Sequence, residues 1–224
     1  MSTPELILYT FCRSSCSARL RIALNYKSLP AHYAYVNLDS NEQFSAKYAS
    51  LNPSKSVPTL VVRDSSSNVA ATATFPITQS HAALEYLEEA YPSSPPLMPS
   101  NPVARAKVRV LTDIIVADTQ PVNGMRVSKQ LGDLGQDVKA WTQTFMALGL
   151  DAYEEVASKT AGKYSVGDEL SLADVVLVPQ CWNAGRVGLE LSRWPTVQRI
   201  FGEVEKLEAV QNAHWTKQAD AEVK

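Results

Sequence analysis

The sequence predicts an α/β domain followed by an all-helical domain. Over residues 1–91, short apolar and β-branched runs alternate with helical patterns, in the order βαβ and then ββα. Residues 103–224 instead carry apolar side chains at three- and four-residue spacing. Five prolines fall within residues 92–102, a density typical of a stiff, extended segment. We therefore place a linker at residues 92–102, between the two predicted domains.

The first half of the α/β domain predicts a βαβ unit. Leu6–Thr10 has the composition of a buried strand, and Ser17–Lys27 has helical composition with apolar residues on one face. His32–Val36 is aromatic and β-branched and predicts a second strand. A strand, a helix and a strand in this order imply parallel pairing and a right-handed crossover.

The second half of this domain predicts a hairpin and a helix. Val57–Val62 predicts an apolar strand, and Pro58 belongs at its start because proline cannot donate to a strand ladder. Most X-Pro bonds are trans, so these residues alone predict a trans peptide. A long loop over Arg63–Pro76 leads into a fourth strand. Gln79–Tyr91 then has helical spacing, which Pro92 stops.

The second domain predicts helices alone. Apolar residues recur at helical spacing in four segments, and Pro195 suits the entry to the last of them. These segments are Val103–Asp118, Val138–Thr160, Leu172–Ala184 and Thr196–Ala209. We expect the tail Lys217–Lys224 to be frayed.

Composition argues against several classes of function. The chain has 224 residues, 45% of them hydrophobic, and a formal net charge of -2, so it lacks a positive field that would attract nucleic acid. Its apolar stretches are far shorter than the roughly 20 residues that span a bilayer, so we expect no membrane segment. An odd number of cysteines and no signal-like N-terminal pattern predict a reducing, cytoplasmic location. The histidines are scattered and the cysteines lack zinc-finger spacing, so we expect no metal.

The loop between the first strand and the first helix is the candidate active site. Ligands gather at the carboxyl ends of strands in open α/β sheets, and a helix N-terminus offers unpaired N–H groups to an anion. The segment Phe11–Ser17 places three serines around a cysteine, namely Ser14, Ser15, Ser17 and Cys16. Three interpretations compete: serines that merely cap the helix, a cysteine nucleophile or redox pair, and hydroxyls that activate a bound thiol. Capping needs one hydroxyl, so the additional serines favour a site that holds a thiolate.

Two further observations bear on this site. Cys12 and Cys16 are separated by three residues, whereas dithiol redox enzymes show C-x-x-C, so redox exchange is the weaker interpretation. The segment Thr78-Gln79-Ser80 opens a helix. One of its hydroxyls would cap that helix, or the N–H groups there would hold a ligand carboxylate.

Together these residues resemble the zeta-class glutathione transferases, also called maleylacetoacetate isomerases, over nearly the whole chain. The most specific match is the run Ser14-Ser15-Cys16-Ser17-Ala18-Arg19-Leu20-Arg21-Ile22-Ala23-Leu24. Further matches in the first half are Leu51-Asn52-Pro53, Val57-Pro58-Thr59-Leu60, Gln79-Ser80 and Tyr86-Leu87-Glu88-Glu89. Those in the second half are Gln120-Pro121, Val166-Gly167-Asp168-Glu169, Leu172-Ala173-Asp174 and Val178-Pro179-Gln180.

The resemblance implies a thioredoxin-like domain that binds glutathione and a helical domain that binds substrate. It implies isomerisation of maleylacetoacetate to fumarylacetoacetate, a step of phenylalanine and tyrosine catabolism, with glutathione as cofactor in a cytoplasmic homodimer. Pro58 would be cis, turning the Val57 backbone outward to pair with glutathione, and this replaces the trans expectation. Ser171 and Asp174 would form a capping box at the start of a buried helix.

The resemblance also implies roles for individual residues. Ser14, Ser15 and Cys16 would be catalytic, although Cys16 could equally be a residue that only lines the site. Residues implied to bind glutathione are Ser14, Ser15, Cys16, Gln43, Lys55, Val57, Pro58, Gln79, Ser80 and Gln120. Arg13 and Arg186 would bind the carboxylates of a small dicarboxylate substrate, with a structural salt bridge as the alternative for Arg186.

Thiol chemistry explains why hydroxyl groups would be needed. The glutathione thiol has an ordinary pKa of about 8.5, so most of it is protonated at neutral pH. Lowering this pKa by about two requires about 2.7 kcal/mol, whereas an exposed helix terminus supplies about 0.3 to 1 kcal/mol. A hydroxyl hydrogen bond to the charged sulfur adds about 1.5 to 3 kcal/mol. We therefore expect Ser14 or Ser15 to donate to the thiolate.

The chain departs from this family at three places, and two other functions stay open. Ala18 stands where the family usually has a large aromatic residue, which would widen the base of the pocket. The loop Arg63–Pro76 is longer than the usual hairpin turn, and Asn123–Arg126 replaces polar contacts that usually follow Gln120. The alternatives are a transferase or dehalogenase that conjugates small electrophiles such as α-haloacids, and a non-catalytic binding module. The intact segment Ser14–Cys16 argues against the module.

Overall fold

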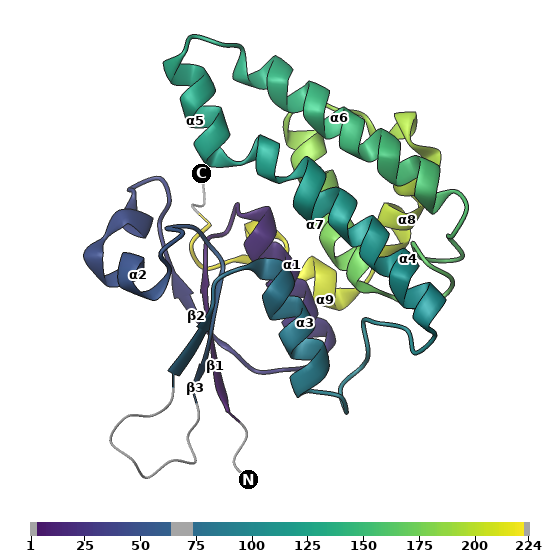
Figure 1. The fold of residues 1–224 in the computed structure, drawn as a ribbon, viewed down its shortest axis with the longest axis horizontal. Coiled ribbons are helices and arrows are strands. Elements are labelled where there is room, and N and C mark those ends of the chain that lie inside the picture. Colours follow the sequence, from purple (N-terminus) through teal and green to yellow (C-terminus); the bar gives the residue numbers. More distant parts are fainter. Residues whose placement is uncertain (1–3, 64–73, 222–224) are drawn as a thin grey trace. The chain divides into compact units, whose positions relative to one another are not determined.

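The computed structural model describes residues 4–63 and 74–221, and the chain divides into two units (Figure 1). The first unit comprises the residues up to Pro95 together with those from Glu208 onward, and the second comprises Pro96–Leu207. The first boundary falls inside the predicted linker 92–102. The residues from Glu208 onward, which we expected in the helical domain 103–224, group with the first unit instead.

A four-stranded mixed sheet organises the first unit. The elements of this unit are β1 Glu5–Thr10, α1 Ser15–Tyr26, β2 His32–Tyr35, η1 Glu42–Phe44, α2 Ala46–Leu51, β3 Thr59–Arg63, β4 Thr74–Ile77, α3 Ser80–Ala90, α9 Glu208–Gln211 and η5 Trp215–Lys217. The strand order is β2-β1-β3-β4, with β1 parallel to β2 and the other two pairs antiparallel. This topology confirms the predicted βαβ unit and the hairpin that follows it.

The hairpin between β3 and β4 is described at its two ends. Arg63, the last residue of β3, pairs with Thr74, the first residue of β4. The long loop predicted over Arg63–Pro76 contains residues 64–73, which lie outside the described residues.

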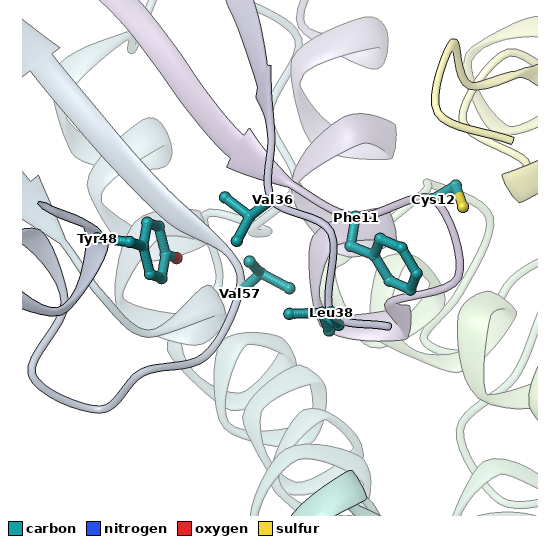
Figure 2. Packing of buried hydrophobic residues seen from close by; sticks show 6 residues of the cluster. All are labelled: Phe11, Cys12, Val36, Leu38, Tyr48 and Val57. Atoms are coloured by element: carbon teal, nitrogen blue, oxygen red, sulfur yellow. The ribbon is translucent and has the colours of Figure 1, made fainter. Parts of the chain in front are cut away.

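Helices cover both faces of this sheet, and a hydrophobic cluster extends the core to the candidate loop. α1 and α3 lie side by side on one face, α9 packs on α1, and α2 lies on the opposite face (Figure 1). Figure 2 shows the cluster, which consists of Phe11, Cys12, Val36, Leu38, Tyr48 and Val57. These residues follow β1 or β2 or precede β3, so the core reaches the carboxyl ends of both parallel strands.

The second unit is built from helices. They are α4 Pro102–Asp113, the π-helical turn η2 Ile114–Thr119, η3 Pro121–Asn123, α5 Met125–Asp133, α6 Val138–Ala157, α7 Leu172–Arg186, η4 Leu191–Arg193 and α8 Pro195–Val204. α7 packs on both α4 and α8 and is buried along most of its length. Pro195 opens α8, as the sequence predicts.

The predicted helix Val103–Asp118 is divided in the structure. It is α-helical only to Asp113 and continues as a π-helical turn, in which the Thr119 hydroxyl donates to the Ile114 carbonyl at 2.6 Å. α6 approaches this turn so closely that a Cβ atom at Gly149 would lie 1.9 Å from Thr119 Oγ1. The contact is tertiary, so the apolar spacing of the segment does not reveal it.

Other helix boundaries also differ from the prediction. Val138–Thr160 ends at Ala157, and Thr196–Ala209 ends at Val204 before the separate α9. The short helices α2 and α5 are absent from the prediction because neither is long enough to repeat an apolar spacing over several turns.

The prediction of a frayed tail over Lys217–Lys224 is wrong where the structure describes it, up to residue 221. Gln218 is buried, and its side chain donates to the main-chain carbonyls of Asn212 and His214, which precede the tail. Asp220 accepts the Cys12 N–H at 2.8 Å. Polar contacts hold this segment, and they leave no periodic pattern in the sequence.

The start of α7 confirms the predicted capping box. Asp174 is fully buried, and its carboxylate accepts both the N–H and the hydroxyl of Ser171 at 2.9 Å. It also accepts the Ser165 N–H at 2.8 Å. Burial raises the pKa of Asp174, and these hydrogen bonds oppose the shift. One carboxylate therefore satisfies several buried donors.

Replacing Asp174 by alanine should destabilise the protein strongly, because buried donors of Ser165 and Ser171 lose their acceptor. We expect a loss of about 3 kcal/mol or more, measured as a lower urea midpoint by circular dichroism. Asp133→Ala, at an exposed position of α5, is the control and should change stability by less than about 0.5 kcal/mol. Equal midpoints for the two variants would contradict the role of Asp174.

Candidate active site

Ser14 caps α1 and closes the loop that follows β1. Its hydroxyl oxygen accepts the Ser17 N–H at 3.1 Å, and its own N–H donates to the Phe11 carbonyl at 3.1 Å. One of the three interpretations of the serines, the helix cap, is thus correct for Ser14. Because the oxygen is the acceptor in the capping bond, the hydroxyl hydrogen stays available for donation to another group.

Ser15 and Cys16 are the first two residues of α1, and both are half-buried. The N–H groups of a first helical turn lack partners within the helix, and the helix dipole favours negative charge there. The structure therefore brings Ser14, Ser15 and Cys16 together at one helix N-terminus, where the sequence places them. An anionic sulfur bound here would meet both the helix terminus and serine hydroxyls.

Cys12 is buried away from this helix turn. Its side chain is 5% exposed, and Sγ donates to the Asp220 main-chain carbonyl at 3.5 Å. Burial first, and the Asp220 carboxylate second, raise the pKa of the Cys12 thiol. Cys12 and Cys16 are both free thiols. A raised pKa disfavours the thiolate that disulfide exchange requires, which weakens the redox interpretation further.

Arg21 forms hydrogen bonds to the backbone of the loop after β1. It is not among the functional residues predicted from the sequence. It is 1% exposed, and its guanidinium donates to Thr10 Oγ1 at 2.9 Å and to the main-chain carbonyls of Phe11 at 3.2 Å and Cys12 at 2.9 Å. Burial lowers the pKa of Arg21 to about 10. The sequence does contain an indication of this role: Arg21 lies within an apolar helical run, where a charged side chain is buried and needs hydrogen-bond partners.

The segment before β3 confirms the expected cis peptide between Val57 and Pro58. Both residues are buried, and the strand register begins only at Thr59, so the Val57 backbone lies outside the ladder. Two side chains hold this turn: the Tyr48 hydroxyl and the Asn52 amide each donate to the Ser56 carbonyl at 2.7 Å. The turn is thus held by side chains of Tyr48 and Asn52, and Val57 takes no part in the register of β3.

The start of α3 is tied to α1 through a buried arginine. Gln79 is the exposed N-cap residue, and Ser80 is the buried first residue of the helix. Ser80 Oγ accepts from Arg19 Nη1 at 3.1 Å, and Arg19 is 2% exposed. Arg19, like Arg21, is a functional candidate that is not predicted from the sequence. It too is a charged residue within the apolar run of α1.

Three more residues of the predicted site belong to the first unit. Gln43 lies in η1 and is 6% exposed, and its buried Oε1 finds no hydrogen-bond partner within the described part of the chain. An orphaned buried acceptor of this kind fits a site that a polar ligand completes. Lys55 is exposed and has a positive φ of 49°. Arg13 is exposed, forms an ion pair with Asp39 and lies over the Phe11 ring.

Gln120 and Arg186 belong to the second unit. Gln120 is half-buried and directly follows the π-helical turn η2, where its N–H donates to the Ile115 carbonyl. Arg186 is the exposed last residue of α7.

Among residues 4–63 and 74–221, none of the helices has the length and apolar character needed to span a membrane. The same residues contain no group of three or more His, Cys, Asp or Glu side chains that could hold a metal ion.

Residues 13–90 match the family described as the N-terminal domain of glutathione S-transferase. A probable glutathione S-transferase of Coccidioides immitis is 49% identical over 98% of this chain and 97% of its own length. A maleylacetoacetate isomerase of Aspergillus fumigatus is 48% identical over 98% of this chain and 94% of its own length.

The solved structures extend this likeness to three dimensions. A crystal structure of maleylacetoacetate isomerase from Anaeromyxobacter dehalogenans, with dicarboxyethyl glutathione and citrate bound in the active site, has a TM-score of 0.89 and 36% identity. The match covers 99% of this chain and 100% of that chain. Since the likeness spans nearly the whole length at high identity, this chain belongs to the glutathione transferase superfamily and, within it, to the zeta-class family of maleylacetoacetate isomerases.

Proposed function

We propose that this chain is a glutathione-dependent isomerase that converts maleylacetoacetate, the cis form, to fumarylacetoacetate, the trans form. The observation that carries the proposal is the N-terminus of α1, where the Ser14 and Ser15 hydroxyls accompany unpaired N–H groups. Glutathione bound there supplies a thiol that adds reversibly to the cis double bond, so that the bond can rotate before the thiol is eliminated. The thiol is regenerated in every cycle, so glutathione acts as a cofactor.

Ser14 is our candidate for the hydroxyl that stabilises the thiolate. Its oxygen already accepts the Ser17 N–H, which restrains the side chain and leaves its hydrogen for the sulfur. A hydrogen bond from the Ser14 hydroxyl to the sulfur would stabilise the thiolate by about 1.5 to 3 kcal/mol, and the helix N-terminus would add about 0.3 to 1 kcal/mol. Together they match the roughly 2.7 kcal/mol that lowers a thiol pKa by about two. Ser15, the next residue and the first of α1, is our second candidate.

Glutathione would be held by groups on three segments of the first unit. The Val57 backbone would pair with the cysteinyl part, which is consistent with its place outside the strand ladder. Gln79 and Ser80 would face the γ-glutamyl end, at a helix N-terminus that favours a carboxylate. Gln43 and Lys55 would add polar contacts, and we also assign Pro58 and Cys16 to this site.

Arginines would bind the two carboxylates of the substrate. Arg13 lies three residues after the end of β1 and two residues before Ser15, so it is our principal candidate, with Arg186 as the second. In the structure Arg13 pairs with Asp39, and both side chains are largely exposed. Exposed pairs contribute at most about 1 kcal/mol, so a substrate carboxylate can replace Asp39 at little cost.

Conjugation of small electrophiles is the second candidate function. The same activated thiol would attack α-haloacids, and a relative in Coccidioides immitis is described as a probable glutathione S-transferase. The two functions differ in the fate of glutathione, which isomerisation returns and conjugation consumes. We further propose that the chain works as a cytoplasmic homodimer, because closed two-fold dimers are the commonest assemblies.

The first test compares wild type with Ser14→Ala and Ser14→Asp in an assay with maleylacetoacetate and catalytic amounts of glutathione. Wild type should complete many turnovers per glutathione. Both variants should lose about 10- to 100-fold in kcat, because neither can donate a hydrogen bond to the thiolate. Asp is a good N-cap residue, so Ser14→Asp should keep its thermal midpoint while Ser14→Ala loses about 1 kcal/mol of stability.

Ser50→Ala, at an exposed position of α2, is the control for this series and should behave as wild type. Isomerisation that survives in Ser14→Asp would exclude Ser14 as the donor. No isomerisation by wild type, together with stoichiometric loss of glutathione with α-haloacids, would replace the isomerase by a transferase.

Arg13 is tested by comparing Arg13→Leu with Asp39→Ala. Removing the arginine should raise KM for maleylacetoacetate by about 10-fold and leave KM for glutathione nearly unchanged, because one charge-assisted contact to a substrate carboxylate is lost. Removing its partner leaves the cation in place, so KM should stay the same or fall. A KM that rises equally in both variants would show that Arg13 serves the ion pair instead.

A further inference from the structure

The segment after α9 returns to the loop that carries the candidate site. The Asp220 carboxylate accepts the Cys12 N–H at 2.8 Å, and the Asp220 main-chain carbonyl accepts Cys12 Sγ at 3.5 Å. Cys12 precedes Ser14 by two residues. These contacts lie within the first unit, and they join residues separated by 208 positions in the sequence.

Arg21 makes a second bridge between the same two segments. Its Nε donates to the Ala213 carbonyl at 3.0 Å, while its Nη atoms hold the Thr10 hydroxyl and the Phe11 and Cys12 carbonyls. The Phe11 carbonyl also accepts the Ser14 N–H. The carbonyls of the loop are thus held by Arg21, and the Cys12 N–H is held by Asp220.

We propose that Asp220 is a positioning residue for the thiolate site, acting through Cys12 to fix the loop from which Ser14 and Ser15 project. The proposal rests on the proposed function of that loop. A carboxylate forms a stronger bond to an N–H than a neutral acceptor does, which suits a loop that must hold hydroxyls in a narrow range of positions.

The charge of Asp220 and its position have opposite effects on a nearby thiol. The carboxylate raises the pKa of Cys12, so its charge alone would oppose formation of a thiolate. It also favours the charged form of Arg21, which stabilises the loop. Removing only the charge of Asp220 should therefore not destabilise a thiolate at the site. Removing the acceptor oxygen as well should increase the mobility of the loop, because the Cys12 N–H loses its partner.

The test compares Asp220→Ala and Asp220→Asn in the full chain, with Lys217→Ala, an exposed neighbour on η5, as the control. The first readout is amide hydrogen exchange of the peptide that contains Cys12, in the absence of glutathione. Asp220→Ala should speed this exchange about 10-fold or more, because a charge-assisted hydrogen bond is lost. Asp220→Asn keeps an acceptor oxygen and should stay within about threefold of wild type.

The second readout is the pKa of the glutathione thiol in the binary complex, followed by the ultraviolet absorbance of the thiolate, together with kcat. Asp220→Ala should raise that pKa and lower kcat about 10-fold, with KM for glutathione changed less than about threefold. Asp220→Asn should restore both values. A merely structural role would lower stability without this rescue or this separation of kcat from KM.

Unchanged exchange at Cys12 in Asp220→Ala would overturn the proposal, and so would faster exchange with an unaltered thiol pKa and kcat. Effects of the same size in Lys217→Ala would overturn it as well. If wild type itself does not ionise glutathione, the proposed function fails, while the exchange comparison still decides whether Asp220 fixes the loop.

Discussion

Burial of the Arg21 guanidinium is the constraint on which the candidate site depends. A charged group removed from water must be surrounded by hydrogen-bond partners, since an unpaired buried charge costs several kcal/mol. Arg21 finds acceptors at the last residue of β1, in the loop that follows it, and at Ala213. These are largely main-chain carbonyls, which also need donors once buried. One side chain thereby fixes the approach to Ser14 and ties the segment from Glu208 onward to the sheet.

The elements that follow local rules could be predicted from the sequence. β1, α1 and β2 are consecutive segments with distinct apolar patterns, so their parallel pairing follows from chain order and handedness. The capping box of α7 needs only Ser171 and Asp174 at the right spacing. The cluster of Ser14, Ser15 and Cys16 is likewise contiguous, so its place at a helix N-terminus follows once the helix is recognised.

Contacts between distant residues could not be predicted in this way. The close packing of Gly149 against Thr119, at the end of the π-helical turn, is a property of helix packing rather than of either segment. The partners of Arg19 and Arg21 lie up to 192 positions away. The cis peptide at Pro58 followed from family resemblance alone, because such bonds are only about 5 to 6% of X-Pro bonds in folded proteins.

The discontinuity of the first unit affects how the protein is made. Residues 96–207 stand between its two parts in the sequence, and ribosomes add only about 5 to 20 residues per second. A nascent chain can form the sheet early, but the Cys12 N–H has no carboxylate to meet until Asp220 has been synthesised, 208 residues later. This contact to the candidate loop can therefore form only late in synthesis, although the loop lies near the beginning of the chain. A chain that ends before Asp220 would lack this acceptor for the Cys12 N–H.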